Sequence, residues 1–122
     1  MATEASTCPQ LEDLTARLEA FVAERDWAQF HSPKNLSMAL AGEAGELLEH
    51  FQWLTEDQSR SLSPATHAAV RAEMADVQNY LLLLARQLDI DLLQAVSDKI
   101  EENARKYPAD KARGHARKYT EL

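Results

Sequence analysis

Apolar residues recur at intervals of three and four along most of this chain, the spacing that places them on one face of an α-helix. The first such stripe begins at Leu11, soon after Pro9, a residue that can occupy the first turn of a helix. It predicts a helix over about residues 10–29. Pro33 disfavours helical backbone at the residue before it, so we expect a loop over residues 30–35.

A second apolar stripe begins at Leu36 and predicts a helix that extends to about Trp53. We expect Asn35 or Ser37 to cap its first turn, because short polar side chains can accept a hydrogen bond from a free backbone N–H. Residues 55–63, rich in Ser, Thr and Asp, are expected to form a linker.

A third helix is predicted to begin at Pro64. Its apolar positions alternate by four and three, a seam typical of helices that pack on partner helices: Val70, Met74, Val77, Leu81, Leu84 and Leu88. A fourth helix, over residues 92–107, should end before Pro108. Residues 109–122 lack a steady apolar period and are predicted to be a basic tail, extended or ordered on assembly. Residues 1–8 are predicted to be a disordered lead.

Composition favours helices over strands, with 17 Leu and 20 Ala against six Val plus Ile. The expected fold class is therefore all-α, with four helices in a bundle-like core. A chain of 122 residues should form one domain, predicted over residues 9–108, which excludes separate catalytic and accessory domains. A monomer of this size buries only about 65% of its unfolded surface, which leaves room for oligomerisation.

The cysteine content points to a reducing compartment, and the hydropathy points to a chain that does not span a membrane. Cys8 is the only cysteine, so an intrachain disulfide and a cysteine-based zinc site are excluded. The longest unbroken apolar run, Leu81 to Ala85, is far shorter than the roughly 20 residues that span a bilayer. Met1 to Gln10 contain no apolar signal segment. We therefore expect a cytoplasmic protein with no membrane partner.

The formal charge of -7 is unevenly distributed. Residues 105–122 contain six Lys and Arg against two acidic residues, which leaves seven Lys and Arg against 18 acidic residues in the remainder. Such an acidic body is not a nucleic-acid surface. The basic tail is interpreted as a solvated terminal segment rather than a nucleic-acid contact, and the acidic body suits a metal site.

Two pairs of acidic residues carry the candidate chemistry. Glu43 and Glu46 are three residues apart on the second predicted helix, and Glu73 and Asp76 are three apart on the third. A spacing of three leaves two side chains about 60° apart around a helix, so both can reach one ion or a close pair of ions. Since both pairs lie within apolar stripes, we expect all four acids at or near the buried face. Their mutual repulsion there would call for cations.

The donors in this cluster are oxygen atoms, which favours Mg²⁺, with Mn²⁺ as a substitute. Gly42 and Gly45 interleave with the acids, and close approach of another helix or of a ligand would justify glycine inside a helix. Ordinary surface carboxylates are the alternative interpretation, although two pairs on consecutive helices weaken it. A di-iron site is disfavoured because neither pair supplies the Glu-x-x-His spacing that such bundles use.

Several motifs taken together point to a protein family more specifically than either pair of acidic residues does alone. Glu43-Ala-Gly-Glu46, followed 27 residues later by Glu73-Met-Ala-Asp76, resembles the Glu-x-x-Glu and Glu-x-x-Asp signature of the MazG-type, all-α nucleoside triphosphate pyrophosphohydrolases. Five further stretches resemble the dCTP pyrophosphatase branch of that family, over 24–36, 42–47, 51–53, 99–108 and 118–122. The resemblance covers about residues 10–122.

The resemblance implies Mg²⁺-dependent hydrolysis of a nucleoside triphosphate, dCTP or a modified dCTP, between its α and β phosphates, for sanitation of the nucleotide pool. It also implies that the four acids hold the metal and that one of them, most plausibly Glu43, activates the attacking water. The residues alone do not identify which acid acts as the general base on the attacking water. Because a triphosphate is strongly anionic, cations must bridge it to an acidic body.

Other residues are candidates for binding the nucleotide. Lys99, Asn103 and Tyr107 repeat every four residues and form one strip that could hold phosphate oxygens, with Lys34 a weaker candidate. Four more residues are candidates for contacts with the base and sugar: Trp27, His31, Trp53 and Tyr80. The alternatives are a solvated strip for the first set and core packing for the aromatic residues.

The resemblance further implies a homotetramer, a dimer of dimers. Leu81 to Leu84 agree with this, because four consecutive Leu residues circle a helix and cannot all face one small core. The basic tail could reach a neighbouring acidic subunit. A non-catalytic acidic helical module that binds a partner protein is the alternative function.

Overall fold

The computed structural model describes residues 8–122, and the prediction of an all-α chain is confirmed, since this part contains helices and no strand. Residues 1–7 of the predicted lead lie outside the described residues. In chain order the helical segments are α1 (Pro9–Glu24), η2 (Ala28–Phe30), α2 (Pro33–Glu49), α3 (Glu56–Ser59), α4 (Pro64–Gln87), α5 (Leu92–Lys106), α6 (Ala109–Ala112) and η3 (Tyr119–Glu121), of which η2 and η3 are 3₁₀ turns.

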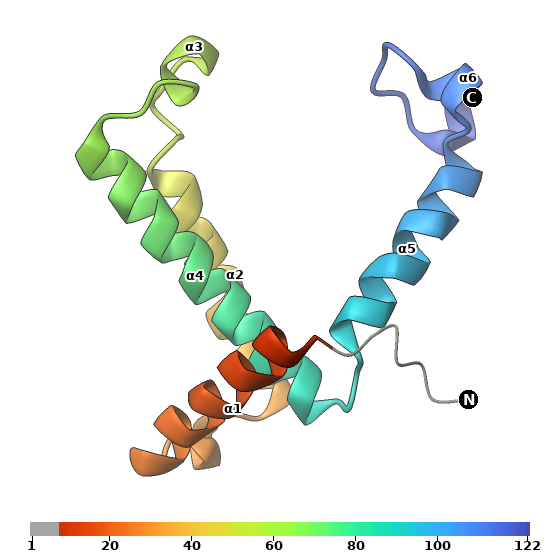
Figure 1. Cartoon of the computed structure of the whole chain (residues 1–122). Coiled ribbons are helices and arrows are strands. Elements are labelled where there is room, and N and C mark those ends of the chain that lie inside the picture. The colour runs from red at the N-terminus through yellow and green to blue at the C-terminus, as the bar shows by residue number, and fades with distance from the viewer. Residues whose placement is uncertain (1–7) are drawn as a thin grey trace. The chain divides into compact units, whose positions relative to one another are not determined.

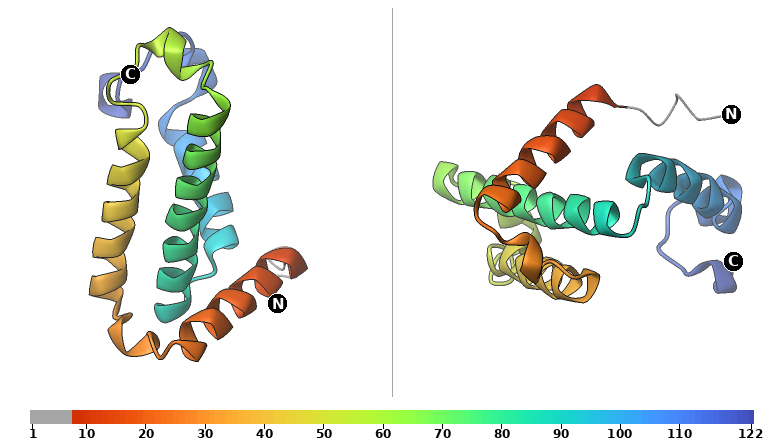
Figure 2. Two further views of the ribbon diagram at one scale, coloured as in Figure 1. Left: turned by 90° about the vertical axis from the view of Figure 1, so that its left-hand side faces the viewer. Right: turned by 90° about the horizontal axis from the view of Figure 1, so that it is seen from below.

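The described chain divides into two compact units, one ending at Asp89 and the other beginning at Ile90. In the first unit α2 and α4 run side by side in opposite directions and are joined at one end by the loop that contains α3 (Figures 1 and 2). α1 packs across α4 near its C-terminal end. Three of the four long helices predicted therefore belong to the first unit, and α5 belongs to the second.

The core of the first unit lies where α1, α2 and α4 meet. Val22, Leu36 and Leu83 are its buried centre, and Leu36 is only 1% exposed. The seam predicted along α4 is partly wrong, because Met74 is 58% exposed and Leu88 is 49% exposed. The buried residues near its C-terminal end are Leu82, Leu83 and Ala85. α4 contacts both α2 and α1, so a single stripe cannot describe its buried surface.

Two helix boundaries differ from the sequence prediction for local reasons. α1 ends at Glu24 rather than near residue 29, because Asp26 adopts a φ of 54°, which a right-handed helix cannot contain. Ser32, not Asn35 or Ser37, caps α2, and its hydroxyl accepts a hydrogen bond of 3.1 Å from the Asn35 backbone N–H. Pro33 fixes the first helical residue immediately after this cap.

The second unit contains α5 and the C-terminal segment. Residues 109–122, predicted to be extended or ordered on assembly, contain α6 and η3, so the extended form of this prediction is wrong in part. The rings of Tyr107 and Tyr119 meet edge to face, with centroids 6.1 Å apart, and the Lys106 ammonium lies 5.0 Å from the Tyr119 ring. These contacts attach the segment to the end of α5. Among residues 8–122, no helix is both long and apolar enough to cross a membrane.

Candidate metal centre

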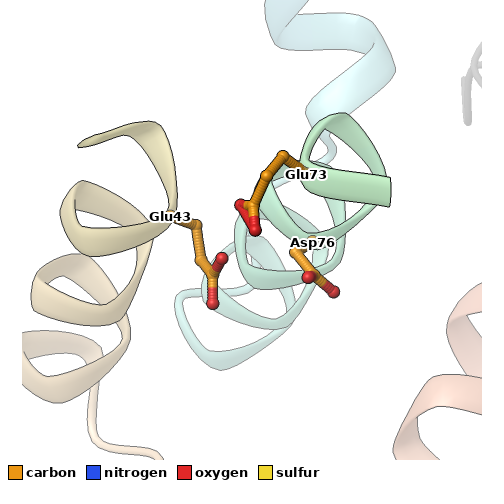
Figure 3. Close-up of side chains that lie close together, drawn as sticks. All are labelled: Glu43, Glu73 and Asp76. Atoms are coloured by element: carbon orange, nitrogen blue, oxygen red, sulfur yellow. The ribbon is translucent and has the colours of Figure 1, made fainter. Parts of the chain in front are cut away.

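Three of the four predicted acids meet between α2 and α4. Glu43 comes from α2, and Glu73 and Asp76 come from α4, with one carboxylate oxygen of each residue within 4.8 Å of the others (Figure 3). The antiparallel packing of the two helices brings the middle of α2 opposite the first half of α4. Residues 30 positions apart in sequence thereby form one acidic cluster.

Burial makes this cluster unstable as a set of free anions. Glu43 and Glu73 are half-buried, and the Oε2 atom of each is inaccessible to solvent and has no hydrogen-bond partner among residues 8–122. A buried carboxylate oxygen without a partner carries a desolvation penalty that water no longer offsets. Asp76 is exposed and extends the cluster toward solvent.

The titration of these acids reflects the same environment. Burial, followed by the proximity of Glu73 and Glu46, raises the pKa of Glu43 from its ordinary 4.5 to about 7. The pKa of Glu73 is also raised, first by burial and then by Glu46 and Asp76. Carboxylates that are held together without a compensating cation favour the protonated state.

The cluster fits a divalent cation on its own chemistry. Its donors are carboxylate oxygens, the ligands that Mg²⁺ and Mn²⁺ prefer, and two of the oxygens lack any partner within the described residues. Glu46 is exposed and is not one of the three residues within 4.8 Å, although it raises the pKa of both Glu43 and Glu73. Of the four acids expected at or near the buried face, Glu43 and Glu73 are half-buried, Asp76 is exposed but joins their cluster, and Glu46 is exposed outside it.

The two glycines of α2 face open space within the described residues. A Cβ atom added at Gly42 or Gly45 would meet no atom of the described structure within 4 Å. Their expected close approach to another helix is thus absent within residues 8–122.

The predicted phosphate strip lies on α5, in the second unit. Lys99 and Lys106 both pair with Glu102, at 3.1 Å and 3.3 Å, and these two ammonium groups, Lys99 first, lower the pKa of Glu102. The Lys99 side chain is 55% exposed, and Asn103 is exposed beside it. Lys34 is exposed in the first turn of α2.

The aromatic candidates for base binding do not form one pocket within this chain. Trp27 lies after α1 and packs edge to face on Phe21, with ring centroids 5.6 Å apart. Tyr80 packs against the core of the first unit. His31 and Trp53 lie beyond opposite ends of α2, a helix of 17 residues that is about 25 Å long. They therefore cannot stack on the same base within one copy of the chain.

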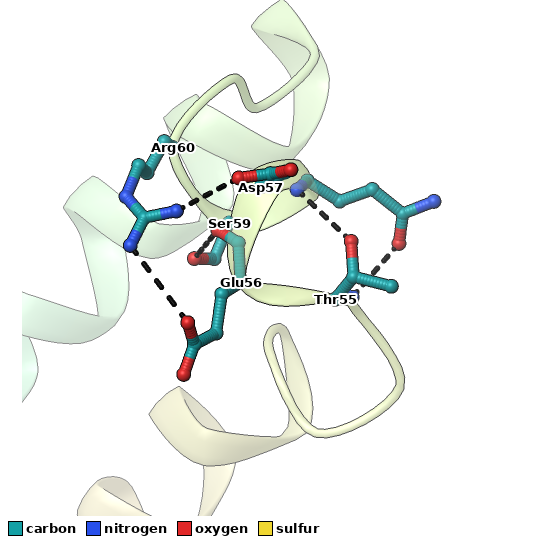
Figure 4. Close-up of polar contacts among 6 residues, drawn as sticks. Thr55, Glu56, Asp57, Ser59 and Arg60 are labelled. Atoms are coloured by element: carbon teal, nitrogen blue, oxygen red, sulfur yellow. Dashed lines mark hydrogen bonds and ion pairs between the residues drawn. The ribbon is translucent and has the colours of Figure 1, made fainter.

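Trp53 is presented on an ordered loop. Its side chain is 86% exposed, the most exposed large apolar residue in the described chain. The following turn, α3, is held by a capping box in which Thr55 and Gln58 exchange hydrogen bonds of 3.2 Å and 2.9 Å (Figure 4). Arg60 adds an ion pair with Asp57 at 3.0 Å (Figure 4). An indole displayed in this way is available to a second molecule.

The sequence interpretation missed a cavity of about 280 Å³ in the first unit. Val22, Leu36 and Leu83 supply apolar lining, and the polar lining consists of Glu19, His31, Arg86 and Gln87. Arg86 pairs with Glu19 at 2.9 Å, although the two residues are 67 positions apart. No local sequence signal connects residues at that separation.

Comparison with known proteins identifies the family. A family model described as the MazG-like family matches residues 39–122, and the match includes all four acids. The chain belongs to the MazG-like family. This confirms the resemblance found in the motifs.

Relatives of this MazG-like chain cover most of its length. It is 49% identical to dCTP pyrophosphatase 1 of Homo sapiens over 93% of this chain and 68% of that protein. It is 46% identical to dCTP pyrophosphatase 1 of Bos taurus over 96% of this chain and 70% of that one. The crystal structure of a pyrophosphatase from Archaeoglobus fulgidus matches with a TM-score of 0.78 and 38% identity, covering 84% of this chain and 95% of that chain.

Proposed function

We propose that this chain is a nucleoside triphosphate pyrophosphohydrolase that converts dCTP, or a modified dCTP, and water to dCMP and pyrophosphate. The observation that carries the proposal is the cluster of Glu43, Glu73 and Asp76. Two of its carboxylate oxygens are buried and have no hydrogen-bond partner among residues 8–122. The chain is also up to 49% identical to proteins named dCTP pyrophosphatase 1. The cluster supplies the chemistry, and the relatives indicate the substrate.

In this proposal Glu43, Glu46, Glu73 and Asp76 hold Mg²⁺, for which Mn²⁺ can substitute. When bound, the metal supplies positive charge that draws the triphosphate to an acidic site and stabilises charge developing on its phosphate oxygens. Glu43 is proposed to orient the attacking water and accept its proton. A bound cation would lower the pKa of Glu43 below its metal-free value of about 7, which keeps the carboxylate ionised and able to accept a proton.

Lys99, Asn103 and Tyr107 are proposed to bind the phosphate groups farther from the base, with Lys34 as an additional cation. Glu102 pairs with both Lys99 and Lys106 in the free chain, at 3.1 Å and 3.3 Å. These pairs are exposed and therefore weak, so a phosphate group could displace them at little cost in free energy.

Trp27, His31, Trp53 and Tyr80 are proposed to contact the base and sugar. Because His31 and Trp53 lie at opposite ends of α2, this assignment needs Trp53 from a second copy of the chain. We propose a homotetramer, a dimer of dimers, in which each pocket is completed across a subunit interface. The open surface at Gly42 and Gly45 and the 64% exposure of Ile100 on α5 support subunit contact.

The deciding experiment is release of pyrophosphate from a panel of deoxynucleoside triphosphates, with and without Mg²⁺. The proposal expects Mg²⁺-dependent release that is fastest with dCTP or a derivative of it. No release from any nucleotide would favour the alternative of a non-catalytic, acidic helical module that binds a protein. Cytoplasmic location and the absence of a nucleic-acid partner remain predictions.

A further inference from the structure

Tyr107 lies outside the helix that carries Lys99 and Asn103, the two other residues proposed to bind the outer phosphates. α5 ends at Lys106, and the Tyr107 backbone has a φ of -123° and a ψ of 71°, which are not helical values. Pro108 explains the change, because a proline disfavours helical backbone at the residue before it. The Tyr107 N–H still donates to the Asn103 carbonyl at 2.8 Å. The helical spacing of four therefore does not by itself fix the direction of the Tyr107 ring.

Tyr119 supplies a contact that the helix does not. The rings of Tyr107 and Tyr119 meet edge to face, with centroids 6.1 Å apart and planes at 80° to each other, an arrangement that aromatic pairs favour. The Lys106 ammonium lies over the same Tyr119 ring, 5.0 Å from its centroid. Tyr119 thus contacts both the last residue of α5 and the first residue after it.

The contact with Tyr119 leaves the polar end of Tyr107 unused. Tyr107 is 37% exposed, and no hydrogen bond within residues 8–122 involves its hydroxyl group. The ring is therefore packed while the hydroxyl has no partner in the described chain. A phenolic hydroxyl can donate a hydrogen bond to a phosphate oxygen.

The segment between the two tyrosines is folded so that it returns to α5 (Figure 1). His115 joins its parts: Nε2 donates to the Lys111 carbonyl at 2.7 Å, and Nδ1 accepts from the Arg117 N–H at 3.3 Å. A neutral imidazole protonated on Nε2 makes both bonds, since a carbonyl oxygen only accepts and an amide N–H only donates. Tyr119 then begins the turn η3. The family match runs to residue 122 and so includes this segment.

We infer that Tyr119 is a positioning residue, which holds the Tyr107 ring so that its hydroxyl is directed at the phosphates bound by Lys99 and Asn103. The inference rests on the proposed function and goes beyond it, because it gives the C-terminal segment a part in binding the triphosphate. Tyr119 itself touches no substrate. Since the chemistry belongs to the acids of the other unit, Tyr119 contributes to the affinity for the phosphate groups.

The test compares Tyr119→Ala with Tyr119→Phe, and Thr120→Ala is the matched control. Phenylalanine keeps the ring that packs on Tyr107 and removes only the hydroxyl of Tyr119. Thr120 is the exposed next residue of the same turn, and its side chain makes no hydrogen bond within residues 8–122. The steady-state constants kcat and KM are measured for dCTP with Mg²⁺, and melting curves verify folding.

Tyr119→Ala should raise the KM for dCTP by about 2- to 12-fold, the range for loss of one edge-to-face contact, with little change in kcat. Tyr119→Phe and Thr120→Ala should keep the original KM. A merely structural role would instead lower kcat at an unchanged KM, in proportion to the folded protein lost. That result, or an equal rise of KM in Tyr119→Phe, would overturn the inference.

A double-mutant cycle tests whether Tyr119 acts through the Tyr107 hydroxyl. Tyr107→Phe keeps the ring contact and removes the hydroxyl, so it should raise the KM by itself. In the Tyr107→Phe background, Tyr119→Ala should then cause little further rise, because the group that it misdirects is already absent. The same rise in both backgrounds would overturn the inference. An unchanged KM in Tyr107→Phe would overturn it as well, although dCTP would still be hydrolysed.

Binding of inorganic pyrophosphate separates this inference from the proposed function. Calorimetric titration with Mg²⁺ present gives dissociation constants for the unmodified chain, Tyr119→Ala and Tyr119→Phe without hydrolysis of a nucleotide. An affinity that falls by about 2- to 12-fold in Tyr119→Ala and is kept in Tyr119→Phe supports the inference even if no nucleotide is hydrolysed. Equal affinities in all three, or no binding by any of them, overturn it even if dCTP is hydrolysed.

Discussion

The surroundings of Glu43 favour its neutral form, whereas the proposed metal site needs its ionised form. Its Oε2 atom is buried without a partner among residues 8–122, which favours a protonated, neutral carboxyl group. Holding a divalent cation requires the ionised form. The residue is therefore poorly stabilised until a cation joins the cluster, and two predictions follow from this conflict.

Replacing the acids with their amides should separate activity from stability. Glu43→Gln, Glu46→Gln, Glu73→Gln and Asp76→Asn should each lower turnover, by about 100-fold or more for Glu43→Gln if it accepts the proton. The metal-free fold should be unharmed or stabilised by Glu43→Gln and Glu73→Gln, because each removes repulsion at the cluster. Pyrophosphate release and melting curves with and without Mg²⁺ measure both effects. Near-normal turnover in all four variants would refute the metal-site assignment.

The stability of the metal-free protein should decrease with pH. The pKa of Glu43 is about 7 in the folded chain, against an ordinary 4.5. Between these values the folded chain retains a proton that the unfolded chain has released, so the free energy of unfolding falls as pH rises from about 4.5 to about 7. Mg²⁺ binds the ionised form and should stabilise the fold more above that window than below it.

Melting temperatures recorded across the window, with and without Mg²⁺, would reveal this dependence. Glu43→Gln is the matched variant, because it should flatten the metal-free profile. A profile that rises with pH in the unmodified chain would contradict the prediction.

At the scale of helices, features that depend on the spacing of nearby residues were predictable from the sequence. Features that depend on backbone conformation or on packing between helices were not. The acid pairs fall on single helix faces because spacing alone determines this. The end of α1 depends on the backbone at Asp26, whose φ of 54° leaves no mark on the apolar period. The pair of Arg86 and Glu19 joins two helices across 67 positions. Its existence depends on packing, which the sequence pattern does not specify.

The cap of α2 offers a direct test at this scale. Ser32→Ala removes the hydroxyl that accepts from the Asn35 N–H at 3.1 Å, and should lower the free energy of unfolding by about 1 kcal/mol. Ser37→Ala is the matched control, because the Ser37 hydroxyl bonds only the Lys34 carbonyl within the described residues. It should change stability by less than about 0.5 kcal/mol. Urea denaturation of both variants measures the difference, and a larger loss in Ser37→Ala would contradict the observed cap.

At the scale of the whole molecule, each of the two units exposes large apolar side chains. In the second unit taken by itself, α5 buries none of its side chains fully, and Val96 and Ile100 on it are 48% and 64% exposed. Met74 and Trp53 in the first unit are also exposed, at 58% and 86%. Patches of this kind on a small protein mark interaction surfaces. The sequence indicated an excess of apolar surface at Leu81–Leu84. Three of these Leu residues line or adjoin the core of the first unit, and the exposed apolar residues lie elsewhere.

If the proposed tetramer forms, light scattering at micromolar concentration should give a mass near four times 13.7 kDa. Trp53→Ala should raise the KM for dCTP, since stacking on a base contributes roughly 1 to 3 kcal/mol. The mass alone does not show whether Trp53 of one copy completes the pocket of another. An experiment that mixes subunits of two variants tests this.

Two defective variants should restore each other if the pocket is shared. Trp53→Ala retains its acids but lacks the indole, and Glu73→Gln retains the indole but lacks an acid. Co-expressed as mixed oligomers, some sites would combine intact acids from one copy with Trp53 of another. At low dCTP concentration, such mixtures should then release pyrophosphate faster than the average of the two variants assayed separately. Activity equal to that average, in oligomers verified to be mixed, would mean that each chain uses its own Trp53, which the length of α2 opposes.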